Sequence, residues 1–190
     1  METRTVTPLT APFTRQTAER LRAGDIVELS GALYTARDAA HKRIEQALSE
    51  GKPPPLDFTR RIIFYAGPCP APPGRVIGPI AATTSIRMDG FLEMMFRLGI
   101  AATVGKGERT AEAALLCKKY GGLYFLSTGG AAALISSLVT SCEEAAYADL
   151  GAESIKKLEV QKIRLIVGID TDGRVFQPEQ IARYRQRPAI

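Results

Sequence analysis

The stretch GDIVELSGALYTARDAAHKR, residues 24–43, predicts a strand followed directly by a helix. Apolar and polar residues alternate in GDIVELSG, and the glycines at both ends favour turns, so we expect a strand over Gly24–Gly31. A helix is expected over about Arg37 to Ser49. Thr35 suits its N-cap, and Asp38 lies three residues on, as in a capping box. This strand–helix unit predicts a mixed α/β fold.

Strands and helices continue to alternate after this unit. Short apolar runs predict strands, and apolar residues at helical spacing predict helices. The expected strands are RRIIFYAGP (60–68), a short strand in PAPPGRVIGP (70–79), IAATVG (100–105), LYFLS (123–127) and two strands in KKLEVQKIRLIVGIDTDGRVF (156–176) joined at Thr171–Gly173. The expected helices are Met88–Leu98, Glu112–Tyr120, GGAAALISSLV (129–139) and a polar helix over Pro178–Arg187.

The composition bounds the class of protein. A chain of 190 residues with 45% hydrophobic residues suits one globular domain. The net charge of +5 suits either nucleic acid or small anions. Because no block of five lysines or arginines occurs and aromatic residues make up only 7%, nucleic acid is the weaker interpretation. The sequence contains no run of about 18 apolar residues, the length needed to span a membrane.

The cysteines and the first residues indicate the compartment. Cys69, Cys117 and Cys142 are far apart and have no metal-ligand spacing with His41, the one histidine. METRTVTPLTAPF has no apolar segment of a signal peptide. We therefore expect a cytoplasmic protein with reduced thiols and no metal of its own.

Cationic residues mark the candidate site. Arg37 and His41 are four residues apart, so they share a helix face near its start, where an anion is favoured. AATTSIRMDG (81–90) places three hydroxyls shortly before Arg87, and Lys106 lies between two glycines. Each pattern has an ordinary structural interpretation as well: a solvated helix turn, a helix cap and a turn lysine.

A glycine-rich segment, STGGAA (127–132), could present backbone N–H groups to an anion or could simply form a tight turn. GIAATVGKGE does not match a phosphate-binding loop, because five residues instead of four separate Gly99 from Gly105.

Taken together, the motifs resemble one family. GDIVELSGALYTARDAAHKR, AGP, TTSIRMDG, VGKGERT, CKKYGGLYFLSTGGAAA and AYADLGAESIKKLEV occur here in the order seen in the β-subunit, or C-terminal domain, of iron–sulfur-dependent (class I) fumarate hydratases. The L-tartrate dehydratase β-subunit is closely similar. The resemblance covers about residues 20–177.

The resemblance implies a fold, a partner and a cofactor. The fold would be a swivelling β/β/α domain over residues 23–177, with a mixed sheet and flanking helices, between an N-terminal lead-in (1–22) and a C-terminal tail (178–190). An α-subunit would supply the cysteines for a [4Fe–4S] cluster, whose iron is a Lewis acid for the substrate hydroxyl. The assembly, a homo-oligomer or heterotetramer, would reversibly hydrate fumarate to malate, and this chain would be inactive alone.

The resemblance also assigns roles to residues. Arg37, Arg87 and Lys106 match the carboxylate-binding cations, and Thr83 matches the residue that transfers a proton at carbon, with help from Lys106. His41 matches an active-site histidine in RDxxH. The hydroxyls of Thr84 and Ser85 would join the substrate-binding residues.

One departure concerns the loop before the threonines. The family usually has Gly-Pro there, and this chain has Ala81-Ala82.

Three alternative functions remain open. The first is tartrate as the substrate, since both substrates are four-carbon dicarboxylates, and the second is a non-catalytic anion-binding module. The third, a nucleic-acid-binding protein, is supported only by the charge.

Overall fold

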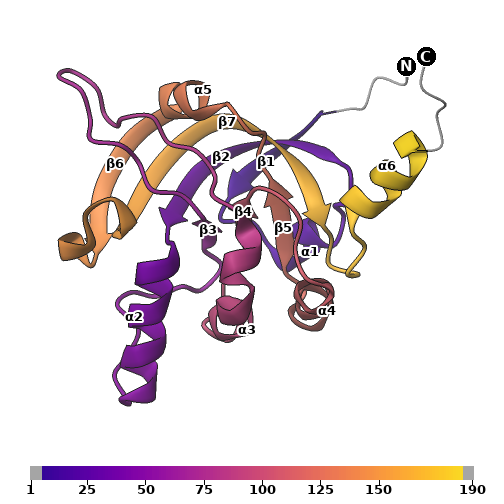
Figure 1. The fold of residues 1–190 in the computed structure, drawn as a ribbon, viewed down its shortest axis with the longest axis horizontal. Helices are drawn as coiled ribbons and strands as arrows, with labels where there is room; N and C mark the ends of the chain where they lie inside the picture. The colour runs from indigo at the N-terminus through magenta and orange to yellow at the C-terminus, as the bar shows by residue number, and fades with distance from the viewer. Residues whose placement is uncertain (1–5, 186–190) are drawn as a thin grey trace.

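The computed structural model describes residues 6–185, apart from the side chains of residues 179, 183 and 184. Helices and strands alternate along most of this part of the chain (Figure 1). In chain order they are β1 (Val6–Ala11), α1 (Arg15–Ala18), β2 (Ile26–Thr35), α2 (Asp38–Ser49), β3 (Ile62–Phe64), η1 (Ser85–Met88), α3 (Asp89–Arg97), β4 (Ala102–Gly105), α4 (Ala111–Tyr120), β5 (Leu123–Leu126), α5 (Ala132–Ser137), β6 (Val139–Ala146), η2 (Ala148–Glu153), β7 (Ile155–Ile169) and α6 (Phe176–Arg185).

The seven strands form one mixed sheet in the order β1-β2-β3-β4-β5-β7-β6. The strands from β1 to β5 pair in parallel, whereas β7 runs antiparallel to β5, β6 and β2. Because β2 pairs with both β3 and β7, the strands β2, β3, β4, β5 and β7 close into a ring. The predicted α/β architecture, a mixed sheet with flanking helices, is confirmed.

The short parallel strands are buried on both faces, which explains their continuous apolar sequences. In β3, Ile62 and Phe64 pack into the core enclosed by the sheet, while Ile63 packs against the helices. Leu123 and Phe125 of β5 likewise face the first core, and their neighbours face the second. Successive side chains of a strand point to opposite faces, so one short run supplies both cores.

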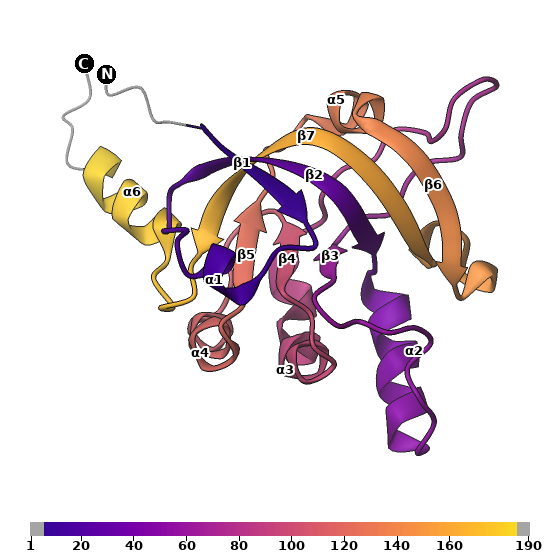
Figure 2. The same ribbon diagram turned by 180° about the vertical axis from the view of Figure 1, so that it is seen from behind.

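Helices α2, α3 and α4 lie on one side of the sheet, and α5 lies on the opposite side beside β6 and β7 (Figures 1 and 2). Each of the three helices follows one of the parallel strands β2, β3 and β4 in the chain. Their apolar residues Ile44, Leu92, Met95 and Leu116 fill the second core. The loops that leave the carboxyl ends of β2, β3 and β4 therefore open toward one edge of the sheet.

Several sequence predictions differ from the structure. Residues 6–11 form β1, which pairs with β2, where a lead-in with one short polar helix was expected over residues 1–22. Residues 139–146 form β6, which was not predicted, and 70–79 contain no strand. The segment expected to hold two strands is the single strand β7 followed by a turn and α6. The last part of the predicted tail helix lies outside the described residues.

The start of α2 also differs from the prediction. Arg37 is the N-cap and makes no side-chain capping bond. The Thr35 hydroxyl instead donates to the Ser154 carbonyl at 3.1 Å and accepts the Lys156 N–H at 2.9 Å. Thr35 is still the last residue of β2, so its side chain secures the strand to its neighbour and no capping box forms.

Among residues 6–185, no helix has both the length and the apolar character needed to cross a membrane.

Candidate active site

The predicted site residues follow the ends of parallel strands. Arg37 comes two residues after β2, and Lys106 comes directly after β4. The loop after β3 leads to Thr83 and Thr84 and then into η1, which contains Arg87. Since the carboxyl ends of parallel strands meet at one edge, residues distant in sequence become neighbours there.

Backbone hydrogen bonds join the threonine segment to Lys106. The Lys106 N–H donates to the Thr83 carbonyl at 3.1 Å, and the Ser85 N–H donates to the Lys106 carbonyl at 3.0 Å. Thr84 and Lys106 form an isolated parallel bridge, and both side chains are exposed. The approach is close because Gly105 lacks a Cβ, which would overlap the Ser85 hydroxyl. The Ala81-Ala82 departure is accommodated, since Ala82 is buried and bridges to Ala66.

An ion-pair chain connects the two arginines. Arg87 Nη2 donates to Thr83 Oγ1 at 2.8 Å and to Asp38 Oδ2 at 3.2 Å. Arg37 Nη2 lies 3.8 Å from the same Asp38 oxygen and 3.7 Å from Glu153 Oε1. Asp38 is thus shared by two guanidinium groups, both of which keep exposed surface (27% for the Arg37 side chain and 46% for Arg87).

Lys106 adds an exposed charge to this edge. Its amine makes no ion pair with any group in residues 6–185, and no side-chain bond of Thr84 occurs there either. The cationic edge, which we define as Arg37, Thr83, Arg87 and Lys106, therefore has donors that the described part of the chain leaves available.

His41 lies beneath this edge and has no exposed surface. Its ring packs against Phe91, with centroids 5.5 Å apart, and edge-on against Tyr65. His41 Nδ1 lies 2.7 Å from the Arg37 carbonyl, which can only accept, so Nδ1 carries the proton, and Nε2 has no partner among residues 6–185. Burial lowers the pKa of His41 to about 4, although the hydrogen bond to Arg37 and the charge of Asp38 act in the opposite direction.

The position of His41 bears on its predicted active-site role, which stays a prediction. A neutral, fully buried imidazole cannot contact a ligand at the surface of this chain. Its bond to the Arg37 carbonyl instead fixes the backbone at the start of α2. We therefore interpret His41 as a residue that positions Arg37.

Ser85 is also placed differently from the prediction. Its side chain is fully buried, and its hydroxyl lies 2.9 Å from the Tyr124 hydroxyl. The Ser85 side chain therefore supports the loop from behind, whereas the exposed Thr84 faces outward with the cationic edge.

The cysteines cannot hold an iron–sulfur cluster together. Cys117 is buried in the helix-side core, where burial raises the pKa of its thiol to about 12, while Cys69 is exposed. Within residues 6–185, no three His, Cys, Asp or Glu side chains are grouped as a metal site would need. The donor set of this part of the chain does not fit a cluster.

The STGGAA segment leads only into the six-residue helix α5, which favours the tight-turn interpretation.

Sequence reasoning missed two carboxylates at this site. Asp38 was interpreted as part of a helix cap, and Glu153 had no signal at all. Glu153 Oε2 accepts the Ala39 N–H at 3.0 Å, so it binds the first turn of α2 as well as Arg37. The adjacent Arg–Asp pair in TARDAAH was a signal for Asp38, but Glu153 is 116 positions from Arg37 and only the fold brings them together.

Comparison with known proteins gives a consistent result. The family model described as Fumarase C-terminus matches residues 2–179. Fumarate hydratase 2 of Leishmania major is 32% identical over 170 residues, which cover 88% of this chain but 30% of that protein. The chain spans less than a third of the length of that fumarate hydratase and of fumarate hydratase 1 from the same organism.

Two relatives have nearly the same length as this chain. The putative L(+)-tartrate dehydratase subunit beta of Methanocaldococcus jannaschii is 36% identical over 173 residues, covering 88% of this chain and 89% of the relative. The L(+)-tartrate dehydratase subunit beta of Escherichia coli strain K12 is 32% identical over 187 residues, covering 94% and 90%. The family model matches almost the whole length of this chain, and two relatives are more than 30% identical over most of their length. The chain therefore belongs to the fumarase C-terminus family.

Proposed function

We propose that this chain is the β-subunit of a hydro-lyase that reversibly hydrates fumarate to malate. The observation that carries the proposal is the cationic edge, in which Arg87 donates to the Thr83 hydroxyl, Arg37 shares the Asp38 carboxylate with Arg87, and the Lys106 N–H binds the Thr83 carbonyl. The similarity to fumarate hydratases and tartrate dehydratase β-subunits supports it. The chain would supply substrate-binding and proton-transfer groups to a site completed by a partner.

Binding of a dicarboxylate follows from the arrangement of charges. Arginine can hold a carboxylate with two parallel hydrogen bonds. Arg37 and Arg87 lie 3.8 and 3.2 Å from the same Asp38 oxygen, which supports binding of one carboxylate between them. A substrate carboxylate would take the place of Asp38 on exposed guanidinium nitrogens, and Lys106 would bind the second one.

Proton transfer is assigned to Thr83. Arg87 Nη2 donates to Thr83 Oγ1, so the positive charge stabilises that oxygen when its proton leaves. A neutral hydroxyl is a weak base, so Thr83 would act as an alkoxide that has given its own proton to solvent, with the Arg87 charge stabilising it and Lys106 assisting. Thr83 would then remove the proton from substrate carbon in dehydration and return it in hydration.

The partner and cofactor complete the proposal. We assign an α-subunit as the partner and an iron–sulfur cluster to that subunit, because the described residues of this chain cannot hold one. The chain alone would then bind a dicarboxylate but would not turn it over.

L-tartrate dehydratase is the second candidate function. The specific observation in its favour is similarity, since the putative tartrate dehydratase subunit beta of Methanocaldococcus jannaschii is 36% identical, against 32% for fumarate hydratase 2 of Leishmania major. Tartrate is also a four-carbon dicarboxylate, so the same arginine pair would bind it.

The test is anaerobic co-expression of the chain with its α-subunit, followed by assays on malate, fumarate and tartrate. Turnover of malate and fumarate well above that of tartrate supports the main proposal, and the reverse order supports the second candidate. An iron-loaded complex that binds these acids and converts none of them would indicate a non-catalytic anion-binding module.

A further inference from the structure

We propose that Arg109 is a positioning residue of the same site, which acts through a buried ion pair with Asp89 to hold Lys106 against Thr83 and Arg87. The inference rests on the proposed function for its chemistry. Its geometry stands independently, because it concerns how two loops of this chain are fastened together. Neither Arg109 nor Asp89 lies on the surface where a substrate would bind.

Arg109 turns inward from the loop that follows Lys106. Its side chain is 1% exposed, and Nε donates to Asp89 Oδ1 at 2.6 Å. Nη1 donates to Thr103 Oγ1 at 3.0 Å. The guanidinium lies near two aromatic rings, 5.5 Å from the centroid of Tyr65 and 5.1 Å from that of Tyr124. These contacts fix the orientation of the planar Arg109 guanidinium as well as the position of its charge.

Asp89 is the partner that links the two loops. It is the first residue of α3 and lies two residues after Arg87. While Oδ1 binds Arg109, Oδ2 accepts both the backbone N–H and the hydroxyl of Thr110, each at 2.8 Å. One buried carboxylate therefore joins the start of α3 to the loop 106–110 through three donors.

A second connection lies beside the first. The Tyr124 hydroxyl donates to the Gly107 carbonyl at 2.9 Å and lies 2.9 Å from the Ser85 hydroxyl. Gly107 has φ of +81°, which allows the chain to turn directly after Lys106. Lys106 is thus the exposed residue of a loop fixed from behind at Gly107 and at Arg109.

Stability alone does not explain such a pair. Replacing a buried ion pair by apolar groups is often neutral or stabilising, because removing the charges from water costs about as much as their attraction returns. A hydrogen-bonded ion pair also fixes the orientation of the two segments that it joins. Here it fixes the backbone that carries Lys106 relative to the turn that carries Arg87, as a site for two carboxylates requires.

The test is a double-mutant cycle in the assembled enzyme. We would measure kcat and KM for malate dehydration in the wild type, Arg109→Met, Lys106→Met and the double variant. Arg109→Met should lower kcat/KM by roughly tenfold or more, mainly by raising KM, because misplacing a binding group costs about this much. In the Lys106→Met background the same change should cost less than about twofold, since the residue through which it acts is gone. Arg109→Lys should recover only part of the loss, as it keeps the charge without the fork.

A matched control and a second readout separate the possible outcomes. Asp170→Asn removes another buried carboxylate far along the chain, so it should lower the melting temperature without changing kcat/KM. Hydrogen exchange should accelerate at the Lys106 and Ser85 amides in Arg109→Met, and not in Asp170→Asn. If Arg109→Met does not assemble, Asp89→Asn replaces it with the same expected results.

Unchanged kinetics, or equal losses with and without Lys106, would overturn the positioning role and leave the proposed function intact. A wild-type complex that converts no dicarboxylate would overturn the proposed function instead. In that case the exchange of the two amides still decides the inference, and unchanged exchange contradicts it.

Discussion

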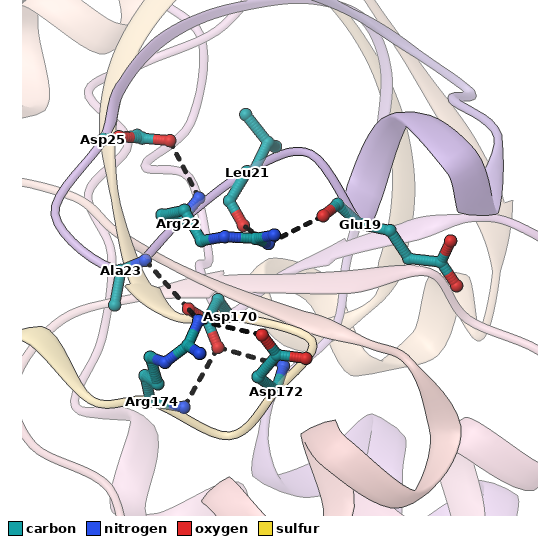
Figure 3. Close-up of polar contacts among 8 residues, drawn as sticks. All are labelled: Glu19, Leu21, Arg22, Ala23, Asp25, Asp170, Asp172 and Arg174. Carbon is teal, nitrogen blue, oxygen red and sulfur yellow. Dashed lines mark hydrogen bonds and ion pairs between the residues drawn. The ribbon is translucent and has the colours of Figure 1, made fainter.

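Asp170 and Asp38 are two carboxylates with opposite surroundings. Asp170 directly follows β7 and is fully buried. Figure 3 shows its contacts: Oδ2 accepts the Ala23 N–H at 3.2 Å, and Oδ1 accepts the N–H groups of Asp172 and Arg174, each at 3.0 Å. The Arg174 guanidinium adds an ion pair at 3.8 Å. Asp38 lies at the cationic edge, about one-third exposed, with Arg87 at 3.2 Å and Arg37 at 3.8 Å.

The segment around Asp170 is held by hydrogen bonds between its own main-chain and side-chain groups. Arg22 donates through Nη1 to the Glu19 carbonyl at 2.7 Å, and its N–H binds Asp25 at 2.8 Å (Figure 3). The Arg22 contacts hold residues 19–25 together, and the Ala23 N–H joins this segment to the turn after β7. A carboxylate bound by main-chain N–H groups is difficult to replace. One shared by two partly exposed arginines can be exchanged for a ligand carboxylate, so the first region stabilises the fold and the second can bind.

The largest effect expected at the cationic edge is on catalysis. Thr83→Val removes the hydroxyl that accepts from Arg87 and keeps a similar shape. If Thr83 transfers the proton, kcat of the assembled enzyme should fall by about 10²–10⁴-fold. The melting temperature should change little, because a partly exposed side chain contributes less than about 0.5 kcal/mol. Steady-state kinetics beside a thermal melt measure both, and a kcat within about twofold of wild type contradicts the assignment.

The interior beneath the edge should show a pH dependence. His41 has a pKa of about 4 in the fold, below its ordinary 6.5, so the unfolded chain takes up a proton that the folded chain does not. Stability from the neutral histidine is complete above about pH 6.5 and is lost as the pH falls toward 4, by on the order of 3 kcal/mol. His41→Gln lacks this titration. Denaturant unfolding from pH 7 to pH 4 should give a steeper loss for the wild type than for the variant, and equal slopes would show that the histidine is not buried in its neutral form.

The Asp170 region should give the opposite pattern to Thr83. Asp170→Asn places an amide N–H₂ against backbone N–H donors and should lower the free energy of unfolding by about 2 kcal/mol. The kinetics of the assembled enzyme should stay unchanged well below the melting temperature. A fall in kcat/KM at equal assembly would mean that the two regions are coupled and that the distinction between them fails.

Local sequence predicted the parallel part of the fold well. The apolar runs around Ile62–Phe64, Ala102–Gly105 and Leu123–Leu126 all form strands, and the helices α3 and α4 begin and end within one residue of the expected positions. These elements are buried, so their apolar pattern is strong. Both missed strands are at the edges of the sheet: β1 contains Pro8, and β6 has the polar sequence VTSCEEAA. Edge strands tolerate proline and charge, which removes the signal.

The sequence named the candidate site residues but not their contacts, and their roles stay predictions. The motifs identified Arg37, Thr83, Arg87 and Lys106 through a family resemblance. Only the fold shows that Thr83 and Lys106 share backbone hydrogen bonds. His41 illustrates the limit most clearly, because its place in RDxxH suggested an active-site histidine but gave no sign that the rings of Phe91 and Tyr65 pack against it.

The central claim is that the cationic edge binds substrate carboxylates, and Arg87→Lys tests it most directly. Lysine keeps the charge and loses the planar pair of donors, so it cannot bind Thr83, Asp38 or a carboxylate as Arg87 does. The measurement is kcat/KM for malate dehydration by the assembled enzyme, with a thermal melt of the same sample. A loss of roughly tenfold or more with an unchanged melting temperature is the predicted result. An unchanged kcat/KM with an unchanged melt would contradict the account, because Arg87 would then be only a solvated residue of the 3₁₀ turn before α3.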